Sequence, residues 1–283
     1  MYRLLITGGN GQLGRAINNL YKDREDIECI NTDVNELDIT DSKAVMAFVE
    51  KCKPYAIVNC AAHTAVDLCE DQIDLAYKIN AIGPRNLSIA AAAFDCKMMQ
   101  ISTDYVFAGD GNKPYIEFDT PAPNSVYGSS KLAGENFVRE FAPKHFIIRT
   151  AWLYGDGKNF VKTMLRLAEE KSEIGVVADQ IGSPTSTVEL AKAMDILLFT
   201  DNYGTFHGTC EGVCSWADFA EEIFKLAGKN VKVQRLTSDQ YPAKAKRPAY
   251  SVLENYMLKL TTDFMFADWH DALKVYLDDL LNQ

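Results

Sequence analysis

The chain has 283 residues, of which 47% are hydrophobic and 24% charged, and a formal net charge of −10. This length suits one large globular domain or two modest ones, and the negative charge argues against non-specific nucleic-acid binding, although it leaves room for a local basic pocket. No run approaches about eighteen apolar residues, and the opening MYRLLITGG reaches glycine too soon for a signal peptide. We therefore expect a cytoplasmic protein without a membrane span.

The seven cysteines show no close metal-type pairing, since Cys210 and Cys214 are separated by three residues. This usage indicates buried or free thiols in a reducing compartment, and we expect no structural metal site.

The chain begins with a pattern typical of dinucleotide binding. An apolar strand at residues 4–6 is followed by a glycine loop that includes Gln12 and Leu13, and then by a helix to about Tyr21. The glycines of the loop permit a tight turn, let the backbone approach a pyrophosphate, and allow the helix to pack closely on the strand. They are Gly8, Gly11 and Gly14. Their place between strand and helix favours a dinucleotide site over an ordinary glycine-rich turn.

The second predicted strand, residues 27–31, ends near Asp33, about 20 residues past the glycine loop. A carboxylate there can bind the adenosine ribose hydroxyls, although a turn or cap aspartate is an equally good interpretation. Asp38 and Ile39 follow in a short loop before a helix over residues 42–51.

Residues 55–60 form a third buried strand, and small residues follow its carboxyl end, where open α/β sheets bind ligands. Among them are Ala62, His63 and Thr64. We interpret His63 as part of a cofactor wall or as a packing residue, because the sequence places no partner acid beside it.

The pattern then predicts a long helix over residues 73–94, kinked at Gly83-Pro84, and a fourth strand over 98–102. Thr103 and Asp104 follow this strand. Their hydroxyl and carboxylate suit a substrate carbonyl and hydroxyl, although such residues also form ordinary turns. Strands that alternate with helices at this rhythm predict a doubly wound parallel sheet of the Rossmann type, with a fifth strand at 145–150.

Tyr127 and Lys131 begin a helix after the Gly- and Pro-rich loop 110–124, and their spacing of four places both side chains on one helix face. An ammonium beside a phenol favours the phenolate and brings the phenol pKa, normally about 10, toward the working range. Tyr127 can then exchange a proton with a substrate oxygen. Alone, the pair is a common accident on a solvated helix face, but the preceding patterns favour a catalytic role.

Beyond residue 151 the pattern loosens, with an aromatic stretch at Trp152 and a basic loop at 244–248. Arg247 in that loop is either a contact for an anionic substrate or a solvated surface residue. The remaining expected elements are helices at 159–170, 187–199, 215–226 and 269–281, and a loop at 179–185. We expect residues 1–150, completed by 185–200, to form the dinucleotide-binding domain, and 151–283 to be mainly an interleaved, smaller substrate-binding lobe.

The assembled motifs resemble the extended short-chain dehydrogenase/reductase family along nearly the whole chain. They are GGNGQLG at 8–14, NCAAHTAVD at 59–67, QISTDYVF at 100–107, YGSSK at 127–131, RTAWLYG at 149–155, DQIGSPT at 179–185 and RPAYSVL at 247–253. Several of these are specific to a branch of sugar-nucleotide reductases. The resemblance implies hydride transfer from NADH or NADPH to the 4-keto carbon of a dTDP-6-deoxyhexose, which gives dTDP-L-rhamnose.

The resemblance also implies roles for individual residues. Tyr127 corresponds to the proton donor, Lys131 to its activator and nicotinamide-ribose ligand, and Thr103 to the hydroxyl that polarises the keto oxygen. Asp104 and Trp152 match substrate contacts. Matches to cofactor contacts are Gly11, Gln12, Leu13, Asp33, Asp38, Ile39, Ala62, His63 and Thr64. Asp33 should attract the ribose 2′-hydroxyl of NADH and repel a 2′-phosphate, partly offset by Arg15, so we expect both cofactors to work and NADH to be at least as good.

One residue separates this chain from related sugar-nucleotide dehydratases, which place a glutamate after Thr-Asp where this chain has Tyr105. Elimination is therefore disfavoured and carbonyl reduction favoured. Two alternatives stay open: a related nucleotide-sugar reductase or epimerase, and a dinucleotide-binding regulatory subunit similar to that of methionine adenosyltransferase. The intact Tyr127, Lys131 and Thr103 favour an enzyme. A homodimer is compatible with the sequence.

Overall fold

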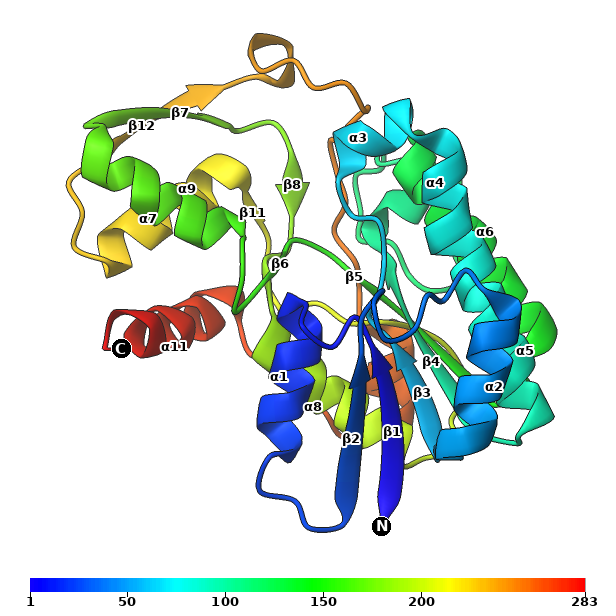
Figure 1. Cartoon of the computed structure of the whole chain (residues 1–283). Helices are drawn as coiled ribbons and strands as arrows, with labels where there is room; N and C mark the ends of the chain where they lie inside the picture. Colours follow the sequence, from blue (N-terminus) through cyan, green and yellow to red (C-terminus); the bar gives the residue numbers. More distant parts are fainter. Residues whose placement is uncertain (283) are drawn as a thin grey trace.

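The computed structural model describes residues 1–282 and centres on a six-stranded sheet in which every neighbouring pair is parallel (Figure 1). The strands, in spatial order, are β10 (Gly204–His207), β5 (His145–Thr150), β4 (Lys97–Thr103), β3 (Ala56–Asn59), β1 (Tyr2–Thr7) and β2 (Ile27–Thr32). The order of the strands reverses at β1: β2 lies on one side of β1, and β3, β4 and β5 follow on the other side. Ligand-binding residues are therefore expected at the carboxyl ends of β1 and β3.

Helices cover both faces of this sheet. The helix α1 (Gln12–Tyr21) packs with α8 (Thr187–Leu198) on one face, and α2 (Ser42–Cys52), α5 (Gly83–Ala93) and α6 (Val126–Phe141) lie on the other (Figure 1). Along β1, Leu4 and Ile6 join the α1 and α8 side of the core and Leu5 joins the α2 and α5 side, because side chains alternate along a strand. The predicted doubly wound Rossmann-type sheet is confirmed.

A smaller lobe lies beside the sheet and is built from later parts of the chain (Figure 1). Its helices are α7 (Phe160–Glu170), α9 (Trp216–Leu226) and α11 (Trp269–Leu281), and its parallel strand pair is β7 (Glu173–Val177) with β12 (Lys232–Leu236). Two-residue strands complete it: β6 (Leu153–Tyr154) with β9 (Thr185–Ser186), and β8 (Ile181–Gly182) with β11 (Cys214–Ser215). No helix within residues 1–282 is both long and apolar enough to cross a membrane.

Several of these elements were not predicted from sequence. The sixth strand, β10, is four residues long, and the expected loop at 179–185 contains β8 and the start of β9. Strands this short show too little alternation to be recognised, and they form because longer neighbours supply the pairing edge. The unpredicted helices are α3 (Val66–Asp71) and α10 (Tyr256–Thr261).

The prediction of a single helix over 73–94 is wrong for residues 78–82. This segment consists of α4 (Ile73–Tyr77), a π-helical turn η1 (Lys78–Ile82) and α5, so the irregularity precedes Gly83. Pro84 has no N–H to donate to the carbonyl of Asn80. A Cβ at Gly134 of α6 would lie 2.2 Å from that carbonyl oxygen, so the irregular turn is pressed directly against α6.

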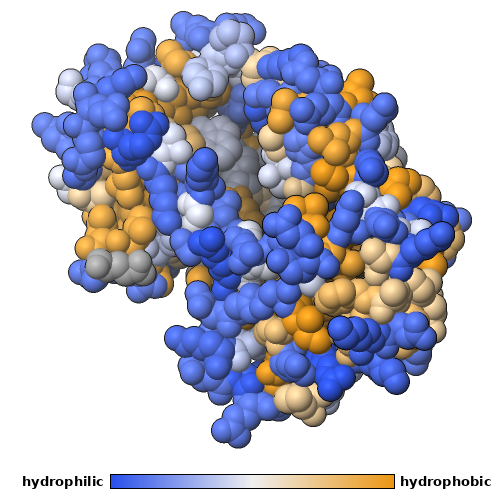
Figure 2. Space-filling view, viewed as in Figure 1, coloured by the Kyte–Doolittle hydropathy of each residue, from blue (hydrophilic) through white to orange (hydrophobic). Residues whose placement is uncertain are grey.

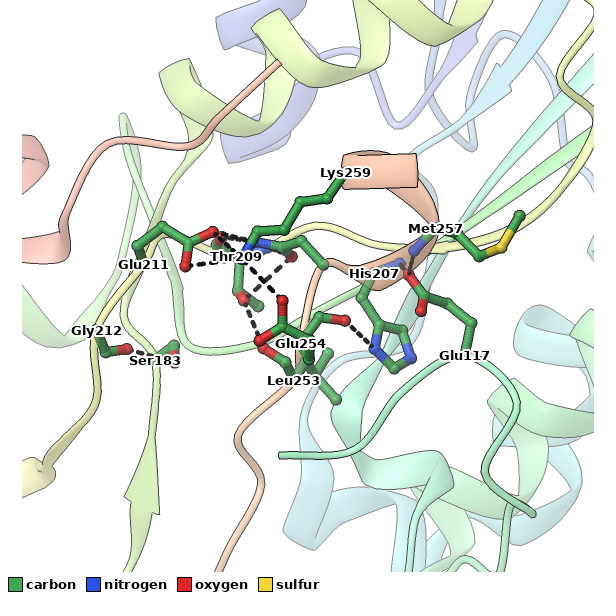
Figure 3. Close-up of polar contacts among 11 residues, drawn as sticks. Glu117, Ser183, His207, Thr209, Glu211, Gly212, Leu253, Glu254, Met257 and Lys259 are labelled. Atoms are coloured by element: carbon green, nitrogen blue, oxygen red, sulfur yellow. Dashed lines mark hydrogen bonds and ion pairs between the residues drawn. The ribbon is translucent and has the colours of Figure 1, made fainter. Parts of the chain in front are cut away.

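The segment after the basic loop returns to the sheet and is fastened there by buried polar contacts (Figure 3). The Asn255 side chain accepts from the Thr209 N–H at 3.0 Å and donates to the Thr209 carbonyl at 2.8 Å. Glu117 accepts from the N–H groups of His207, at 2.8 Å, and Met257, at 3.1 Å. These contacts anchor the C-terminal part of the chain to β10 and to the loop that precedes α6.

Candidate active site

A cavity of about 700 Å³ lies at the carboxyl ends of the central strands, and Figure 2 shows the hollow between the two lobes. Most residues singled out from the sequence line it: Gly8, Gly11, Gln12, Leu13, Asp33, Asp38, Ile39, Ala62, Thr64, Thr103, Asp104, Tyr127, Lys131 and Trp152. Gly14, His63 and Arg247 do not line it. The volume lies within the range of small-molecule and cofactor sites.

The glycine loop is shaped for a pyrophosphate. Gly8 has a φ of 69°, which favours glycine, and a Cβ at Gly14 would lie 2.5 Å from the Gly8 carbonyl oxygen. Gly11 precedes α1, whose first turn has no side-chain cap and no acidic residue. Its free N–H groups therefore point at the cavity as an anion site, and the residues fit a dinucleotide.

The adenosine side of the cavity carries two carboxylates. Asp33 accepts hydrogen bonds from the backbone N–H of Asn10, at 3.2 Å, and from its side-chain amide. The hydroxyl and N–H of Thr40 donate to Asp38, which holds the pKa of Asp38 below its usual value. Arg15 pairs with Asp156 of the smaller lobe at 2.9 Å, and its guanidinium is therefore occupied by a carboxylate in this state.

The expected cofactor-wall residue His63 lies beside the cavity. Its backbone N–H donates to the Asn80 side chain at 2.8 Å, and its ring nitrogen lies 3.2 Å from the Gln72 side-chain oxygen. Its backbone therefore helps to fix the segment that carries Ala62 and Thr64, which do line the cavity.

Thr103 and Asp104 stand at the end of β4, where the strand passes into a short 3₁₀ turn. The Thr103 hydroxyl donates to a carboxylate oxygen of Asp104 at 2.8 Å. Asp104 is almost fully buried, and burial raises its pKa to about 6. The pair therefore presents a hydroxyl and a carboxyl group to one wall of the cavity.

Tyr127 lies in the first turn of α6, and three contacts fix that turn. The Ser125 hydroxyl accepts from the Gly128 N–H at 3.1 Å, and Glu70 of α3 accepts from the Val126 N–H at 2.8 Å. A Cβ at Gly128 would lie 2.1 Å from the backbone oxygen of Tyr105, so the turn approaches the end of β4 closely. These contacts place Tyr127 beside Thr103.

The electrostatics of the pair differ from the sequence expectation. Lys131 donates to the Ile101 carbonyl at 2.6 Å, and burial lowers the pKa of Lys131 to about 8. Burial also raises the pKa of Tyr127 above its usual value, against the lowering influence of a hydrogen bond with Thr103. The expected shift toward the phenolate is wrong in this state because desolvation is the largest influence on the phenol. Tyr127 is therefore a neutral phenol at neutral pH, the form that can donate a proton to a carbonyl oxygen.

Arg247 reaches the edge of this site from the basic loop. One guanidinium nitrogen lies 2.7 Å from a carboxylate oxygen of Asp67, and another donates to the Tyr105 hydroxyl at 3.2 Å. The ring of Tyr105 meets that of Tyr127 edge-on, with centroids 5.5 Å apart. Asp67 ends the NCAAHTAVD motif, but its contact with Arg247 depends on the helix α3, which the sequence pattern does not predict.

Trp152 stands at the junction of the lobes, directly after β5. Its indole is stacked on that of Trp216, with centroids 3.6 Å apart and an interplanar angle of 8°. Trp216 also lines the cavity, although it was not predicted to be a site residue. No local pattern marks Trp216 as a site residue, since it is simply the first residue of α9 after its cap.

A glycine loop at an uncapped helix, a Tyr-x-x-x-Lys pair whose lysine is buried, and a hydroxyl at the end of a neighbouring strand therefore share one cavity. This fold and site define a dinucleotide-dependent oxidoreductase that acts on a carbonyl or hydroxyl group.

The comparisons with known proteins identify the family. Residues 2–282 match the family described as "RmlD substrate binding domain". A dTDP-4-dehydrorhamnose reductase crystal structure from Clostridium acetobutylicum is 56% identical, with a TM-score of 0.97 over 99% of this chain and 100% of that one. The enzyme from Bacillus anthracis in complex with NADP is 44% identical, with a TM-score of 0.96 over 99% and 100%. A dTDP-4-dehydrorhamnose reductase from Aggregatibacter actinomycetemcomitans is 42% identical over 97% of this chain and 98% of its own length. The chain belongs to the dTDP-4-dehydrorhamnose reductase family of extended short-chain dehydrogenases/reductases.

Proposed function

We propose that this chain reduces the 4-keto group of dTDP-4-dehydrorhamnose (dTDP-4-dehydro-6-deoxy-L-mannose) to give dTDP-L-rhamnose with NAD(P)H, the final step of dTDP-rhamnose biosynthesis. The observation that carries the proposal is the convergence of Tyr127, Lys131 and Thr103 in the cavity that begins at the glycine loop. Full-length similarity to dTDP-4-dehydrorhamnose reductases supports the substrate.

The reduced nicotinamide supplies the hydride for the keto carbon. The neutral phenol of Tyr127 donates the proton that the keto oxygen takes up. Thr103 polarises the same oxygen when its hydroxyl hydrogen turns from Asp104, to which it donates at 2.8 Å, to the keto oxygen. Lys131 binds the nicotinamide ribose and, when protonated, stabilises the phenolate that Tyr127 leaves behind. The phenolate then takes a proton from solvent, which restores the phenol before the next turnover.

The chain should use both NADH and NADPH, with NADH at least as good. Asp33 suits the ribose 2′-hydroxyl, and Arg15, the cation that follows the glycine loop, is held by Asp156 at 2.9 Å. Measuring kcat/KM for both cofactors at saturating sugar tests this. A preference for NADPH above about a hundredfold, equal to about 2.7 kcal/mol, would show that Asp33 is misassigned.

Trp152 and Arg247 are proposed to hold the nucleotide sugar. Trp152 lines the cavity and packs against the deoxyhexose. The guanidinium of Arg247 forks onto a phosphate, a planar bidentate contact that lysine does not reproduce. To do so it exchanges its contacts with Asp67 and Tyr105 for the phosphate. The Asp67 pair is partly exposed, so breaking it costs little.

We also propose that the chain forms a homodimer through α4 and the π-helical turn η1. Four hydrophobic side chains are exposed there: Ile73 by 49%, Leu75 by 42%, Tyr77 by 38% and Ile82 by 37%. Figure 2 shows hydrophobic residues gathered over α3 and α4. Sedimentation of Tyr77→Asp beside the unaltered chain tests this, since a charge in an apolar interface should give a monomer.

Seven free thiols support a cytoplasmic location.

The deciding assay is oxidation of NADH and NADPH with a panel of nucleotide-linked 4-keto sugars. We expect dTDP-4-dehydrorhamnose to be reduced with the highest kcat/KM of the panel, and the product to be dTDP-L-rhamnose. Absence of turnover with every member of the panel, for a protein that still binds NADPH, would refute the proposed activity.

A further inference from the structure

Among the described residues after Leu153, one residue of the smaller lobe lines the cavity. Within residues 1–282, the residues that line the cavity end at Leu153 and resume with Trp216 alone. Trp216 is the first residue of α9, whose Ser215 and Asp218 form a capping box. The cap satisfies the helix end without the indole, so the position of the ring in the cavity is not needed to start the helix.

Trp216 and Trp152 act as one surface. Their indoles are stacked at 3.6 Å, and Phe160 packs against the Trp216 ring at 4.7 Å. Trp152 has a φ of 49°, in the left-handed region that is strained for a residue with a side chain. A Cβ at Gly182 would lie 2.5 Å from its indole. Strain persists where surrounding contacts over-determine it, and here those contacts are Gly182 and the Trp216 ring.

The chemistry of this surface selects the part of a nucleotide sugar that it can bind. Thr103, Asp104 and Tyr127 supply hydroxyl and carboxyl groups on one wall of the cavity, whereas the two stacked indoles present apolar ring surface on another. Apolar ring carbons carry no positive charge with which to bind a phosphate. They suit the C–H groups of a pyranose ring and the methyl group of a 6-deoxy sugar, which carry no charge and gain from being removed from water.

We propose that Trp216 is a substrate-binding residue that, together with Trp152, forms a two-indole platform for the deoxyhexose ring. The proposal rests on the proposed function, since it assigns the sugar of that substrate to this wall. Trp216 contributes apolar contact of its own and holds the strained Trp152 in place.

The test uses Trp216→Leu, which keeps apolar volume without a ring, and Trp216→Phe, which keeps a smaller ring. Trp216→Leu should raise KM for dTDP-4-dehydrorhamnose about tenfold, and Trp216→Phe should raise it less. The inhibition constant of dTDP, which lacks the sugar, and KM for NADPH should stay within about twofold. The near-ultraviolet circular dichroism of the coupled indoles should disappear in Trp216→Leu.

Phe160→Leu is the matched control, because Phe160 packs on the same ring but does not line the cavity. It should leave KM for the sugar nucleotide within about twofold. An equal rise in KM for Phe160→Leu would show that the cluster acts only through lobe packing and would overturn the proposal. Unchanged KM in Trp216→Leu would also overturn it. An equal loss of dTDP binding would overturn it as well, because dTDP lacks the sugar that the proposal assigns to this wall. If the unaltered chain does not turn over the substrate, the proposed function fails instead.

Discussion

The catalytic helix is tied to the sheet by a buried ion pair, and Glu135→Gln is the perturbation that tests it. Glu135 lies one turn after Lys131 in α6, with no exposed side-chain surface, and the side chain of Arg149 on β5 is only 2% exposed. Two guanidinium nitrogens of Arg149 donate to the two carboxylate oxygens, at 2.9 and 2.8 Å. The Ser102 hydroxyl and Arg139 donate to the same carboxylate. A neutral amide in this place leaves the Arg149 charge buried without its partner.

Removing one partner of a buried pair costs about 3–5 kcal/mol, a large part of the roughly 5–15 kcal/mol by which a domain is stable. Burial raises the pKa of Glu117, and the nearby Arg149 charge opposes that rise, so the Glu117 carboxylate offers partial compensation. We therefore expect Glu135→Gln to lose about 3 kcal/mol of unfolding free energy, the lower end of the range, measured by urea unfolding. The matched control is Glu140→Gln on the exposed side of the same helix, which should change by less than about 0.5 kcal/mol. A loss below about 1 kcal/mol for Glu135→Gln would refute the reasoning.

The same substitution should change the pH profile. The negative charge of Glu135 raises the pKa of Lys131, which burial lowers to about 8. Cofactor binding that needs the ammonium should therefore decline above about pH 8 in the unaltered enzyme, and at lower pH in Glu135→Gln. Measuring KM for NADPH from pH 6 to 9 in both proteins checks this difference. Identical pH profiles for the unaltered enzyme and Glu135→Gln would contradict the role of Lys131.

Three further predictions concern stability and substrate. Burial lowers the pKa of His207 from 6.5 to about 3. Between these pH values the unfolded chain binds a proton at His207 that the native chain does not bind. The free energy of unfolding should therefore decrease as the pH falls from 6.5 to about 3, by up to about 1.4 kcal/mol per pH unit. Urea unfolding at pH 7 and pH 5 should show a smaller change in unfolding free energy in His207→Gln than in the unaltered chain. An equal change in both proteins would show that other titrating groups cause it. Arg247→Lys should lower kcat/KM for dTDP-4-dehydrorhamnose with KM for NADPH unchanged; equal effects on both would remove Arg247 from the sugar-nucleotide site. The free 4-keto-6-deoxyhexose should be a very poor substrate, because nucleotide contacts orient the sugar; equal kcat/KM for free and linked sugars would indicate a generic carbonyl reductase.

The parts of the fold that could be predicted are those with a local signature. The glycine loop, the buried strands and Thr103 at a strand end each follow from short patterns, and parallel-sheet topology then brings them to one edge. Trp216 could not be found this way, because it reaches the cavity through the pairing of β8 with β11, which are two residues long. Asp67 could not be found for a similar reason, since α3 has six residues and begins without a side-chain cap.

The direction of the Tyr127 pKa shift also depended on information that the sequence lacks. The spacing of Tyr127 and Lys131 predicts proximity, and proximity alone favours the phenolate. Burial is the largest influence on the pKa of Tyr127, and it is set by the packing of α6 against β4. Burial keeps Tyr127 protonated, which suits reduction.

The most direct test of the central claim is turnover of dTDP-4-dehydrorhamnose by Tyr127→Phe at saturating NADPH, beside the dissociation constant of NADPH. The phenyl ring keeps the shape of the site and removes the proton. We expect kcat to fall by at least about 10² to 10⁴, the contribution of positioned acid catalysis, with NADPH binding nearly unchanged. Near-normal turnover in Tyr127→Phe would contradict the claim that this residue protonates the keto oxygen.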